Sequence, residues 1–388
     1  MRIAIDIRKI GKKSTGDETY TFYLIKELMR LPRSREHQFF LLTDESPQKI
    51  TEILPILPDN FVVYQVLPAN KILWTFYSLP RFLKQNRVDV LHVQYITPFY
   101  LTQKIKIVTT IHDISFRINP KWINKKDSFL LNRFIPPSLK RADKVLTVSE
   151  FSKKEIAEYY KFPVNKIVVA HPAVDERLFS FNSEKSDREI VKKICGNSFP
   201  FILHVSSLQP RKNVPLLIKA FRELKKEWRE KNSQWQKIKL IIVGSREGHN
   251  FDQKIDEVLK KSSFRKDIFI TGYLPMKDLP SLYRQAILTV FPSAYEGFGL
   301  PLLESMASKT AVLTSNIGSF VEVGKDAGTY FSLNKKESEI ISEMKIKIRE
   351  LIENKKLREK QIKLGQERVK KFTWPKMAEK ILETYLSI

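Results

Sequence analysis

The chain has 388 residues and a formal net charge of +25; 42% of its residues are hydrophobic and 29% are charged. This composition excludes a disordered or fibrous chain, and the length suits two domains that each bury a core. Cys195 is the single cysteine, so no intramolecular disulfide can form, and no run of 18 apolar residues is present to span a membrane. The N-terminal "MRIAIDIRKIGKK" predicts a strand rather than a signal peptide. We therefore expect a protein of a reducing, cytoplasmic compartment.

The basic charge indicates an anionic partner. A pI near 9.8 fits nucleic acid, an anionic membrane surface or a phosphorylated small molecule. The sequence has no block of five or six consecutive basic residues, no zinc-finger spacing and no aromatic RNA-binding signature. Nucleic acid is thus the least favoured of the three, although a basic polyanion- or nucleic-acid-binding protein remains the alternative from another functional class.

Short apolar runs alternate with helical patterns through the first half of the chain. Helices are predicted between most of these runs, notably over 18–30, 129–141 and 149–160, the last with Ser149 as its N-cap. Runs that are apolar on both faces are typical of parallel strands covered by helices. We therefore interpret residues 1–180 as a Rossmann-like, acceptor-binding domain. Its predicted strands occupy residues 2–8, 38–43, 61–66, 90–93, 105–111, 144–149 and 166–171.

A polar segment near the midpoint, residues 181–198, interrupts the alternation and is interpreted as a linker. Residues 199–374 resume it and form a second Rossmann-like domain, and a final helix over 375–388 is expected to pack back on the first domain. The predicted fold class is therefore α/β, with two doubly wound parallel sheets facing a central cleft. Such sheets bind ligands outside the carboxyl ends of their strands, where functional residues are expected. The strands predicted here occupy residues 201–206, 239–244, 268–273, 289–294 and 311–315.

Two loops of the first domain follow strands and therefore reach this edge. "TTIHDISF" places His112 and Asp113 directly after a strand, and "GKKSTGDETY" after the first strand contains Gly16. A lone His-Asp pair is more often structural than catalytic, but its position favours a functional role here.

In the second domain, "HVSSLQPRKNVPLLIKAF" predicts a strand, a turn and a helix, with Arg211 and Lys212 at the start of the helix. Basic side chains stabilise the C-terminal end of a helix, not its start. An anion is therefore expected to bind between these two residues and the start of the helix. With the free N–H groups of the first turn, they suit a diphosphate. Two solvated charges without a ligand are the plainer interpretation.

The stretch "SAYEGFGLPLLESMA" carries two acids, Glu296 in a loop and Glu304 in the first turn of a helix predicted to begin at Pro301. The helix dipole could explain Glu304 alone, with a stabilisation of about 0.3–1 kcal/mol. A carboxylate also accepts hydrogen bonds from two adjacent hydroxyls, which suits a ribose or a hexose. The small Gly299 would let backbone N–H groups approach such a ligand.

The sequence has no D-x-D triplet, the pattern that would hold a divalent metal against a nucleotide-sugar diphosphate. We expect no metal and no cofactor, with Arg211 and Lys212 supplying the positive charge. A nicotinamide dehydrogenase is disfavoured because no G-x-G-x-x-G follows a strand.

Together these motifs resemble the retaining, metal-independent glycosyltransferases of family four, which have the GT-B fold. "EGFGLPLLESMA" resembles the E-x7-E motif of that family. Further segments resemble the family in the same order along nearly the whole chain: "LHVQYITPF", "TTIHDISF", "VLTVSEFSKKEI", "LQPRKN", "ITGYLPMKDLPSLYRQA" and "FTWPKMAEKILETY". The sequence departs from the family pattern at Glu18, where a second glycine is frequent, and at Ser206, where a glycine is common.

The resemblance implies a role for each matching residue. Glu296 and His112 would be catalytic residues at the donor sugar, and Glu304 would bind the ribose. The diphosphate would be held by Arg211, Lys212 and Gly16, the sugar by the backbone of Phe298, Gly299 and Leu300, and the base by the backbone around Tyr273 and Leu274.

The expected activity is transfer of a hexose from a nucleoside-diphosphate sugar, GDP- or UDP-linked, to a hydroxyl of a saccharide or lipid-linked glycan. The resemblance favours mannose slightly and implies retention of configuration and cell-surface polysaccharide synthesis; UDP-dependent glucosyl or N-acetylhexosaminyl transfer stays open. Residues 70–85 and 119–141 mix aromatic, aliphatic and basic side chains, as interfaces with anionic lipid do. Peripheral binding at the inner face of a membrane is therefore weighed against ordinary amphipathic helices.

Overall fold

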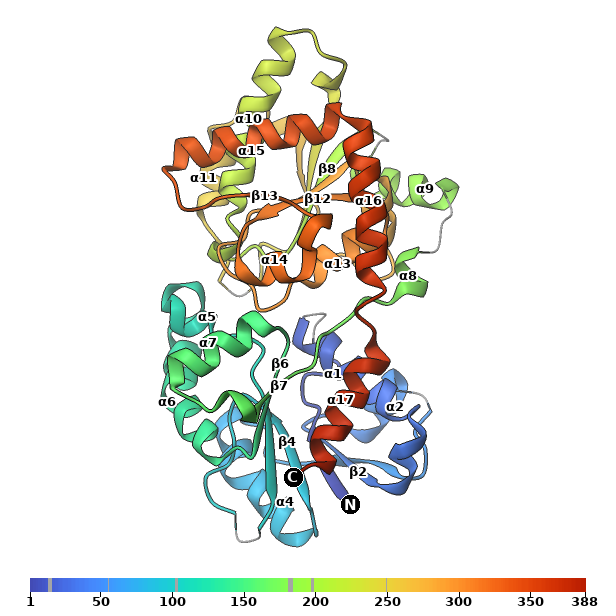
Figure 1. Cartoon of the computed structure of the whole chain (residues 1–388), viewed down its shortest axis with the longest axis vertical. Coiled ribbons are helices and arrows are strands. Elements are labelled where there is room, and N and C mark those ends of the chain that lie inside the picture. The colour runs from blue at the N-terminus through green and yellow to red at the C-terminus, as the bar shows by residue number, and fades with distance from the viewer. Residues whose placement is uncertain (13–15, 55, 102–103, 181–183, 197–198, 249) are drawn as a thin grey trace. The chain divides into compact units, whose positions relative to one another are not determined.

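A computed structural model describes residues 1–12, 16–54, 56–101, 104–180, 184–196, 199–248 and 250–388. The chain divides into two compact units (Figure 1). The first unit contains Met1–Pro120, Lys125–Pro172 and Thr373–Ile388, and the second contains Lys121–Asn124 and Ala173–Phe372.

The first unit is built on a parallel sheet of seven described strands, in the order β3-β2-β1-β4-β5-β6-β7. The chain runs outward from β1 through β2 and β3, and then crosses to β4 on the other side of β1. This reversal makes the β1/β4 boundary the topological switch point of the sheet. The strands are β1 (Arg2–Asp6), β2 (Gln38–Thr43), β3 (Phe61–Gln65), β4 (Val90–Gln94), β5 (Lys106–Thr110), β6 (Lys144–Thr147) and β7 (Ile167–Val169).

Helices and turns connect these strands. Ser149 caps α7 as predicted, since its side chain accepts a hydrogen bond from the Ser152 N–H, and Lys161 ends the helix in a left-handed conformation. The elements are α1 (Gly16–Leu28), η1 (Pro32–Glu36), α2 (Pro47–Ile53), α3 (Lys71–Leu73), the π-helical η2 (Trp74–Ser78), α4 (Leu79–Gln85), α5 (Ser115–Ile118), η3 (Pro120–Trp122), α6 (Lys125–Arg141), α7 (Glu150–Tyr160), η4 (Val164–Lys166) and α17 (Trp374–Leu386).

Helix α17, from the C-terminal end of the chain, completes the first unit by packing on α1 (Figure 1). The ring of Trp374 stacks on Tyr23 with centroids 4.4 Å apart, and the Tyr385 hydroxyl lies 2.6 Å from Nδ1 of the buried His92. Because Trp374 and Tyr385 are buried, they contribute core packing that the first half of the chain lacks by itself.

The second unit repeats the plan with six described parallel strands in the order β10-β9-β8-β11-β12-β13. All five strands predicted here are present. The edge strand β13 was not predicted because its residues follow Gly328 and begin with Thr329 and Tyr330, so they do not form a continuous apolar run. The strands are β8 (Phe201–Val205), β9 (Lys239–Val243), β10 (Ile268–Ile270), β11 (Leu288–Phe291), β12 (Ala311–Ser315) and β13 (Thr329–Phe331).

Helices cover both faces of this sheet. The buried core on one face joins the strands to α10, α11 and α15, while α16 packs on α13 and β12. The elements are α8 (Glu176–Ser180), α9 (Glu184–Cys195), η5 (Pro210–Lys212), α10 (Val214–Glu230), η6 (Gln234–Lys237), α11 (Lys254–Lys260), η7 (Arg265–Asp267), α12 (Leu279–Gln285), α13 (Leu300–Ala307), α14 (Gly318–Gly324), η8 (Lys325–Ala327), α15 (Glu337–Glu353) and α16 (Lys355–Val369). The expectation of two Rossmann-like sheets is confirmed.

The expected linker over 181–198 differs from the structure. It contains α9, which belongs to the second unit and packs on α12. Asp187 of α9 is only 1% exposed and accepts hydrogen bonds at 2.7 Å from both Nε and Nη2 of Arg284, and one from the hydroxyl of Ser281. Because the buried face of this helix carries a charged residue, its packing could not be predicted from a pattern of hydrophobic residues. The boundary between the units lies at Pro172/Ala173 instead.

Candidate functional site

The switch point of the second sheet lies between β8 and β11, which pair with each other although β9 and β10 lie between them in the chain. Arg211 and Lys212 lie in the turn η5 after β8, and Glu296 follows β11. The carboxyl ends of parallel strands meet at one edge, so the three predicted residues converge where open α/β sheets bind ligands.

These residues contact one another directly. Arg211 Nη1 lies 2.7 Å from Glu296 Oε2, Lys212 Nζ is paired with Glu296 Oε1, and the Ser293 hydroxyl donates to the same Oε1 at 2.8 Å. The Glu296 side chain is 12% exposed. We call Arg211, Lys212, Ser293 and Glu296 the Glu296 cluster; it holds one more positive than negative charge in a largely enclosed place.

The cluster keeps Glu296 ionised. Burial by itself would raise the pKa of this carboxyl, but the charges and hydrogen bonds of Lys212 and Arg211 outweigh burial and lower the pKa to about 2. Glu296 is therefore a carboxylate throughout the neutral range.

Backbone contacts fix the two loops that carry the cluster. Asn213, with a left-handed φ of 52°, ends η5 and begins α10, and its side chain donates to the Pro292 carbonyl at 3.0 Å. The Ala294 N–H donates to the Arg211 carbonyl at 2.7 Å. The loop after β8 and the loop after β11 thus form one rigid support.

Glu304 lies beyond the first turn of α13, because the helix begins at Leu300 and Glu304 is its fifth residue. The placement in the first turn was wrong, and a helix-dipole role loses its basis with it. The Tyr283 hydroxyl, on α12, donates to Glu304 Oε2 at 2.8 Å. Burial raises the pKa of Glu304 to about 7, although this hydrogen bond acts in the opposite direction.

Gly299, directly before α13, has the backbone freedom expected of it. Its φ is 109°, and a Cβ atom there would lie 2.6 Å from a ring carbon of Phe320. The side chain of Phe298 is buried against Phe372, so Phe298 presents its backbone and not its ring. Leu300 is the first residue of α13, so its N–H precedes the carbonyl acceptors of the helix.

Tyr273 and Leu274 follow β10, at the same edge of the sheet as the cluster but two strands from β8. The Tyr273 side chain is exposed, and Gly272 before it has a φ of 78° and forms a bridge with Gly244.

His112 and Gly16 belong to the first unit. His112 is buried after β5, edge-on against Tyr20, with Nε2 3.8 Å from Asp17 Oδ1. Burial lowers the pKa of His112, which keeps the imidazole neutral. The Asp113 carboxylate accepts from the Ser115 N–H at 2.9 Å, so it shapes the turn. Gly16 is exposed and is the first residue of α1.

The sequence analysis missed several residues at the second site. Ser293 and Tyr283 hold the two acids, and nothing in their spacing indicates this. His204 on β8 donates from Nδ1 to the Val290 carbonyl at 2.8 Å, which leaves Nε2 to accept from the Ser206 hydroxyl at 2.6 Å. Burial lowers the pKa of His204 to about 4, so this neutral tautomer persists.

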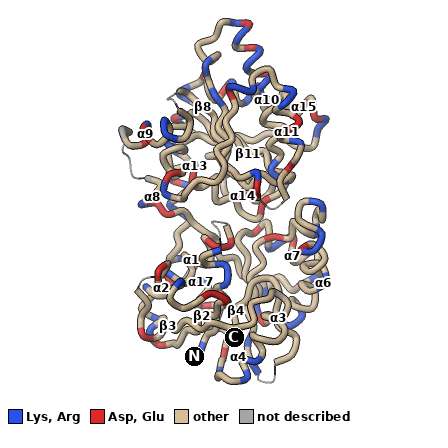
Figure 2. Tube along the Cα trace, turned by 180° about the vertical axis from the view of Figure 1, so that it is seen from behind, with Lys and Arg blue, Asp and Glu red and all other residues tan. Residues whose placement is uncertain are grey.

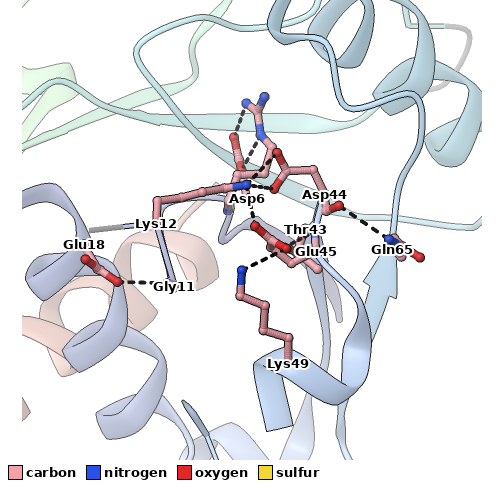
Figure 3. Close-up of polar contacts among 10 residues, drawn as sticks. Asp6, Gly11, Lys12, Glu18, Thr43, Asp44, Glu45, Lys49 and Gln65 are labelled. Atoms are coloured by element: carbon pink, nitrogen blue, oxygen red, sulfur yellow. Dashed lines mark hydrogen bonds and ion pairs between the residues drawn. The ribbon is translucent and has the colours of Figure 1, made fainter. Parts of the chain in front are cut away.

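A polar network at the carboxyl ends of β1 and β2 was also missed (Figure 3). Lys12 Nζ lies 3.1 Å from Asp44 and 2.7 Å from Glu45, and Lys49 Nζ lies 3.0 Å from Glu45. Beside them, Asp6 holds the guanidinium of Arg8 in two hydrogen bonds. We call Asp6, Arg8, Lys12, Asp44, Glu45 and Lys49 the β1–β2 network; its balanced donors and acceptors suit a ligand rich in hydroxyls.

Near this network lies Glu18, the residue that stands where the family frequently has a second glycine. Its side chain forms a contact that a glycine could not form. Its Oε1 accepts a hydrogen bond from the Gly11 N–H at 2.8 Å, so the side chain ties α1 to the turn at Gly11 (Figure 3).

Among the residues that the structure describes, no three His, Cys, Asp or Glu side chains are grouped as metal ligands. Within the same residues, no helix is both long and apolar enough to cross a membrane.

Comparison with known proteins agrees with the two-unit fold. Residues 186–368 match the family described as Glycosyl transferases group 1, and residues 14–178 match the family described as Glycosyltransferase Family 4. The chain is 30% identical over 288 residues to O-antigen chain mannosyltransferase B of Escherichia coli, covering 74% of this chain and 72% of that protein. The chain therefore belongs to the group 1 glycosyltransferases of family four.

A second relative and a solved structure extend over more of the chain. O-antigen chain mannosyltransferase RfbU of Salmonella typhimurium is 25% identical over 86% of this chain and 88% of its own length. The crystal structure of Anabaena Alr3699/HepE in complex with UDP-glucose superposes with a TM-score of 0.73 over 100% of both chains, at 15% identity. The GT-B fold class is thus confirmed.

Proposed function

We propose that this glycosyltransferase moves a hexose from a nucleoside-diphosphate sugar to a hydroxyl of a saccharide or lipid-linked glycan, with retention of configuration. The observation that carries the proposal is the Glu296 cluster, because it joins two cations and a carboxylate at the switch point of the second sheet. A diphosphate needs the cations, and a sugar ring that develops positive charge needs the carboxylate.

The cluster would act on both sides of the breaking bond. As the bond between C1 and the phosphate oxygen lengthens, Arg211 and Lys212 stabilise the negative charge on the leaving diphosphate. The Glu296 carboxylate faces the positive character of the sugar ring. The acceptor hydroxyl attacks C1 from the face that the phosphate leaves, and its proton passes to the departing phosphate oxygen. In this proposal fixed charge replaces a metal ion, and no cofactor takes part.

We propose further contacts for the donor. Glu304 has one oxygen engaged by Tyr283, so Oε1 is the oxygen that would accept from the ribose hydroxyls. The backbone of Phe298, Gly299 and Leu300 would hold the sugar hydroxyls. We assign the base to the backbone around Tyr273 and Leu274, the sugar also to His112, and the phosphate side also to Gly16.

Mannose from GDP-mannose is our preferred donor sugar because two relatives are named mannosyltransferases. UDP-glucose or a UDP-N-acetylhexosamine is the alternative, which the UDP-glucose complex of the Anabaena protein favours. The same relatives are named for O-antigen chains, so we place the reaction in cell-surface polysaccharide synthesis.

The acceptor side belongs to the first unit in this proposal. The β1–β2 network offers carboxylates, a guanidinium and ammonium groups at a strand edge, all of which hydrogen-bond sugar hydroxyls. A lipid-linked acceptor would bring the protein to the inner face of a membrane.

A panel of GDP-mannose, UDP-glucose and UDP-N-acetylglucosamine tests the proposal. Hydrolysis of one donor by the purified protein, unaffected by EDTA and lost in Glu296→Gln, is the expected result. If none of these nucleotide sugars is hydrolysed or raises Tm, while duplex DNA does raise Tm, the protein is a polyanion binder instead.

A further inference from the structure

The basic charge of the chain is concentrated in one stretch, most of which belongs to the first unit. Residues 67–141 carry thirteen Lys and Arg against three Asp and Glu. Figure 2 shows Lys and Arg along α6, which lies within this stretch. A surplus of this size attracts a partner with many negative charges.

Exposed apolar side chains gather in the same stretch. Fifteen large hydrophobic side chains are exposed among the described residues, and seven of them lie between Leu67 and Phe129. Tyr100 is 89% exposed and Tyr77 is 54% exposed. Exposing this much apolar surface to water is unfavourable. Such a concentration of exposed apolar side chains therefore indicates an interaction site.

Three phenylalanine rings in mutual contact bring these segments together in space. Phe76 of η2 lies 4.8 Å from Phe99, which follows β4, and 5.2 Å from Phe134 of α6, between ring centroids. Phe99 and Phe134 are 5.7 Å apart. Tyr77 and Tyr100 are the chain neighbours of two of these rings, so both exposed tyrosines flank one half-buried aromatic group.

Three exposed arginines surround the same group. Arg81 Nη1 lies 3.4 Å from the Tyr77 hydroxyl, Arg133 lies 5.8 Å from the Phe134 ring, and Arg141 donates to the Phe99 carbonyl. Within the described residues, none of the three forms an ion pair with a carboxylate. Their charge is therefore available to an external anion. We call Tyr77, Arg81, Tyr100, Arg133 and Arg141 the tyrosine–arginine surface.

We propose that the tyrosine–arginine surface docks the protein on an anionic lipid bilayer. Tyrosine rings favour the headgroup region, where the hydroxyl stays hydrated, and guanidinium groups pair with lipid phosphates. The interfacial charge of anionic lipid complements the basic stretch. A second copy of the chain fits less well, because a twofold contact would place the three arginines against their own copies.

The test is co-sedimentation of the full chain with vesicles that contain no glycan lipid, so its outcome is independent of the proposed reaction. Vesicles of phosphatidylcholine with about 30% phosphatidylglycerol should sediment the protein at about 50 mM salt and release most of it at about 300 mM. Vesicles of phosphatidylcholine alone should sediment at least about tenfold less, since each basic group contributes through lipid charge.

Two variants separate this surface from bulk charge. Arg81→Glu with Arg133→Glu should lower the partition coefficient about tenfold or more, and Tyr77→Ser with Tyr100→Ser should lower it while net charge is unchanged. The matched control is Lys356→Glu with Lys360→Glu on exposed positions of α16, which changes net charge equally and should retain binding. Circular dichroism and donor hydrolysis report that each variant is folded.

Three results would overturn the proposal. One is no sedimentation with the anionic vesicles at low salt. Another is an equal loss in the α16 control. The third is a lipid-free dimer that the tyrosine variant abolishes, which would assign the surface to a second copy.

Discussion

Glu296 lies between two cations and stays ionised. The contribution of its charge can therefore be tested separately from that of its size. Glu296→Gln keeps the shape but removes the negative charge, which should reduce transfer by about 10²–10³-fold, as loss of one group that stabilises transition-state charge does. Steady-state kinetics with the preferred donor would measure this. The control is Glu339→Gln on the exposed face of α15, and full activity in Glu296→Gln would remove Glu296 from the mechanism.

The same substitution has a pH signature in stability. The pKa of Glu296 is lowered in the folded protein to about 2, below its ordinary value of 4.5, so its ionised form stabilises the fold above pH 4.5. This contribution is lost as the pH falls from 4.5 toward 2. The stability difference between the native protein and Glu296→Gln, measured by urea unfolding, should therefore be largest at pH 6 and shrink toward pH 3. A stability difference that does not change with pH would contradict the lowered pKa of Glu296.

Tyr283 should control the protonation of Glu304. Its hydrogen bond favours the carboxylate, so Tyr283→Phe should raise the pKa of Glu304 further above about 7, by about one unit for a bond to a charged group. If Glu304 binds the ribose as a carboxylate, the KM for the donor should decrease with rising pH and then level off once Glu304 is ionised. In Tyr283→Phe this levelling should occur at a higher pH than in the native protein, while kcat at pH 9 should be unchanged. An unshifted profile with a uniformly reduced kcat would indicate a structural role only.

These residues also mark the limit of sequence reasoning. Arg211, Lys212 and Glu296 could be brought together from sequence because each follows a strand, and parallel strands share one edge. The partners Ser293, Tyr283 and His204 could not, because a hydroxyl or an imidazole in an apolar stretch has the pattern of any core residue. Their hydrogen bonds depend on contacts across as many as 86 positions, as between His204 and Val290.

Helix α13 depends on one glycine at its start. Gly299→Ala would combine a positive φ with a Cβ 2.6 Å from Phe320, so a loss of about 2–4 kcal/mol is expected from strain and overpacking. Thermal and urea unfolding would measure it. Gly16→Ala is the matched control for stability, because a Cβ at Gly16 has no atom within 4 Å; an equal loss in both would contradict the explanation.

Helix α9 shows how a polar element can be mistaken for a linker. Its anchor is Asp187, and Asp187→Ala would leave Arg284 without its buried carboxylate and Ser281 without its acceptor, at a cost of about 3–5 kcal/mol. Urea unfolding of the second unit would report this loss, while Lys192→Ala on the exposed face of the same helix should be neutral. If Asp187→Ala left the stability of the second unit unchanged, α9 would be a linker and not part of its packed structure.

Across the chain as a whole, the alternation of strands and helices predicted twelve of the thirteen described strands. This succeeded because buried parallel strands are continuous apolar runs, a local property. The C-terminal helix was expected to pack on the first domain, and Thr373–Ile388 does belong to the first unit. The boundary between the units was less accessible, since it depends on which surfaces meet: residues 173–180 were expected in the first domain but join the second unit.

The two units should respond separately to damage in α17. Trp374→Ala removes the ring that stacks on Tyr23 and should destabilise the first unit by about 3–5 kcal/mol. Hydrogen exchange should accelerate in β1–β7 and remain slow in β8–β13. Lys376→Ala on the exposed face of α17 is the control, and equal acceleration in both units would show that they unfold as one.

Helix α17 also sets an order of events during synthesis. Tyr385 is synthesised 293 residues after His92, which its hydroxyl contacts. The residues of the second unit end at Phe372, so all of them are made before α17. The first unit keeps its α1 surface uncovered until α17 has been made, so the unit whose synthesis begins first is the one completed second.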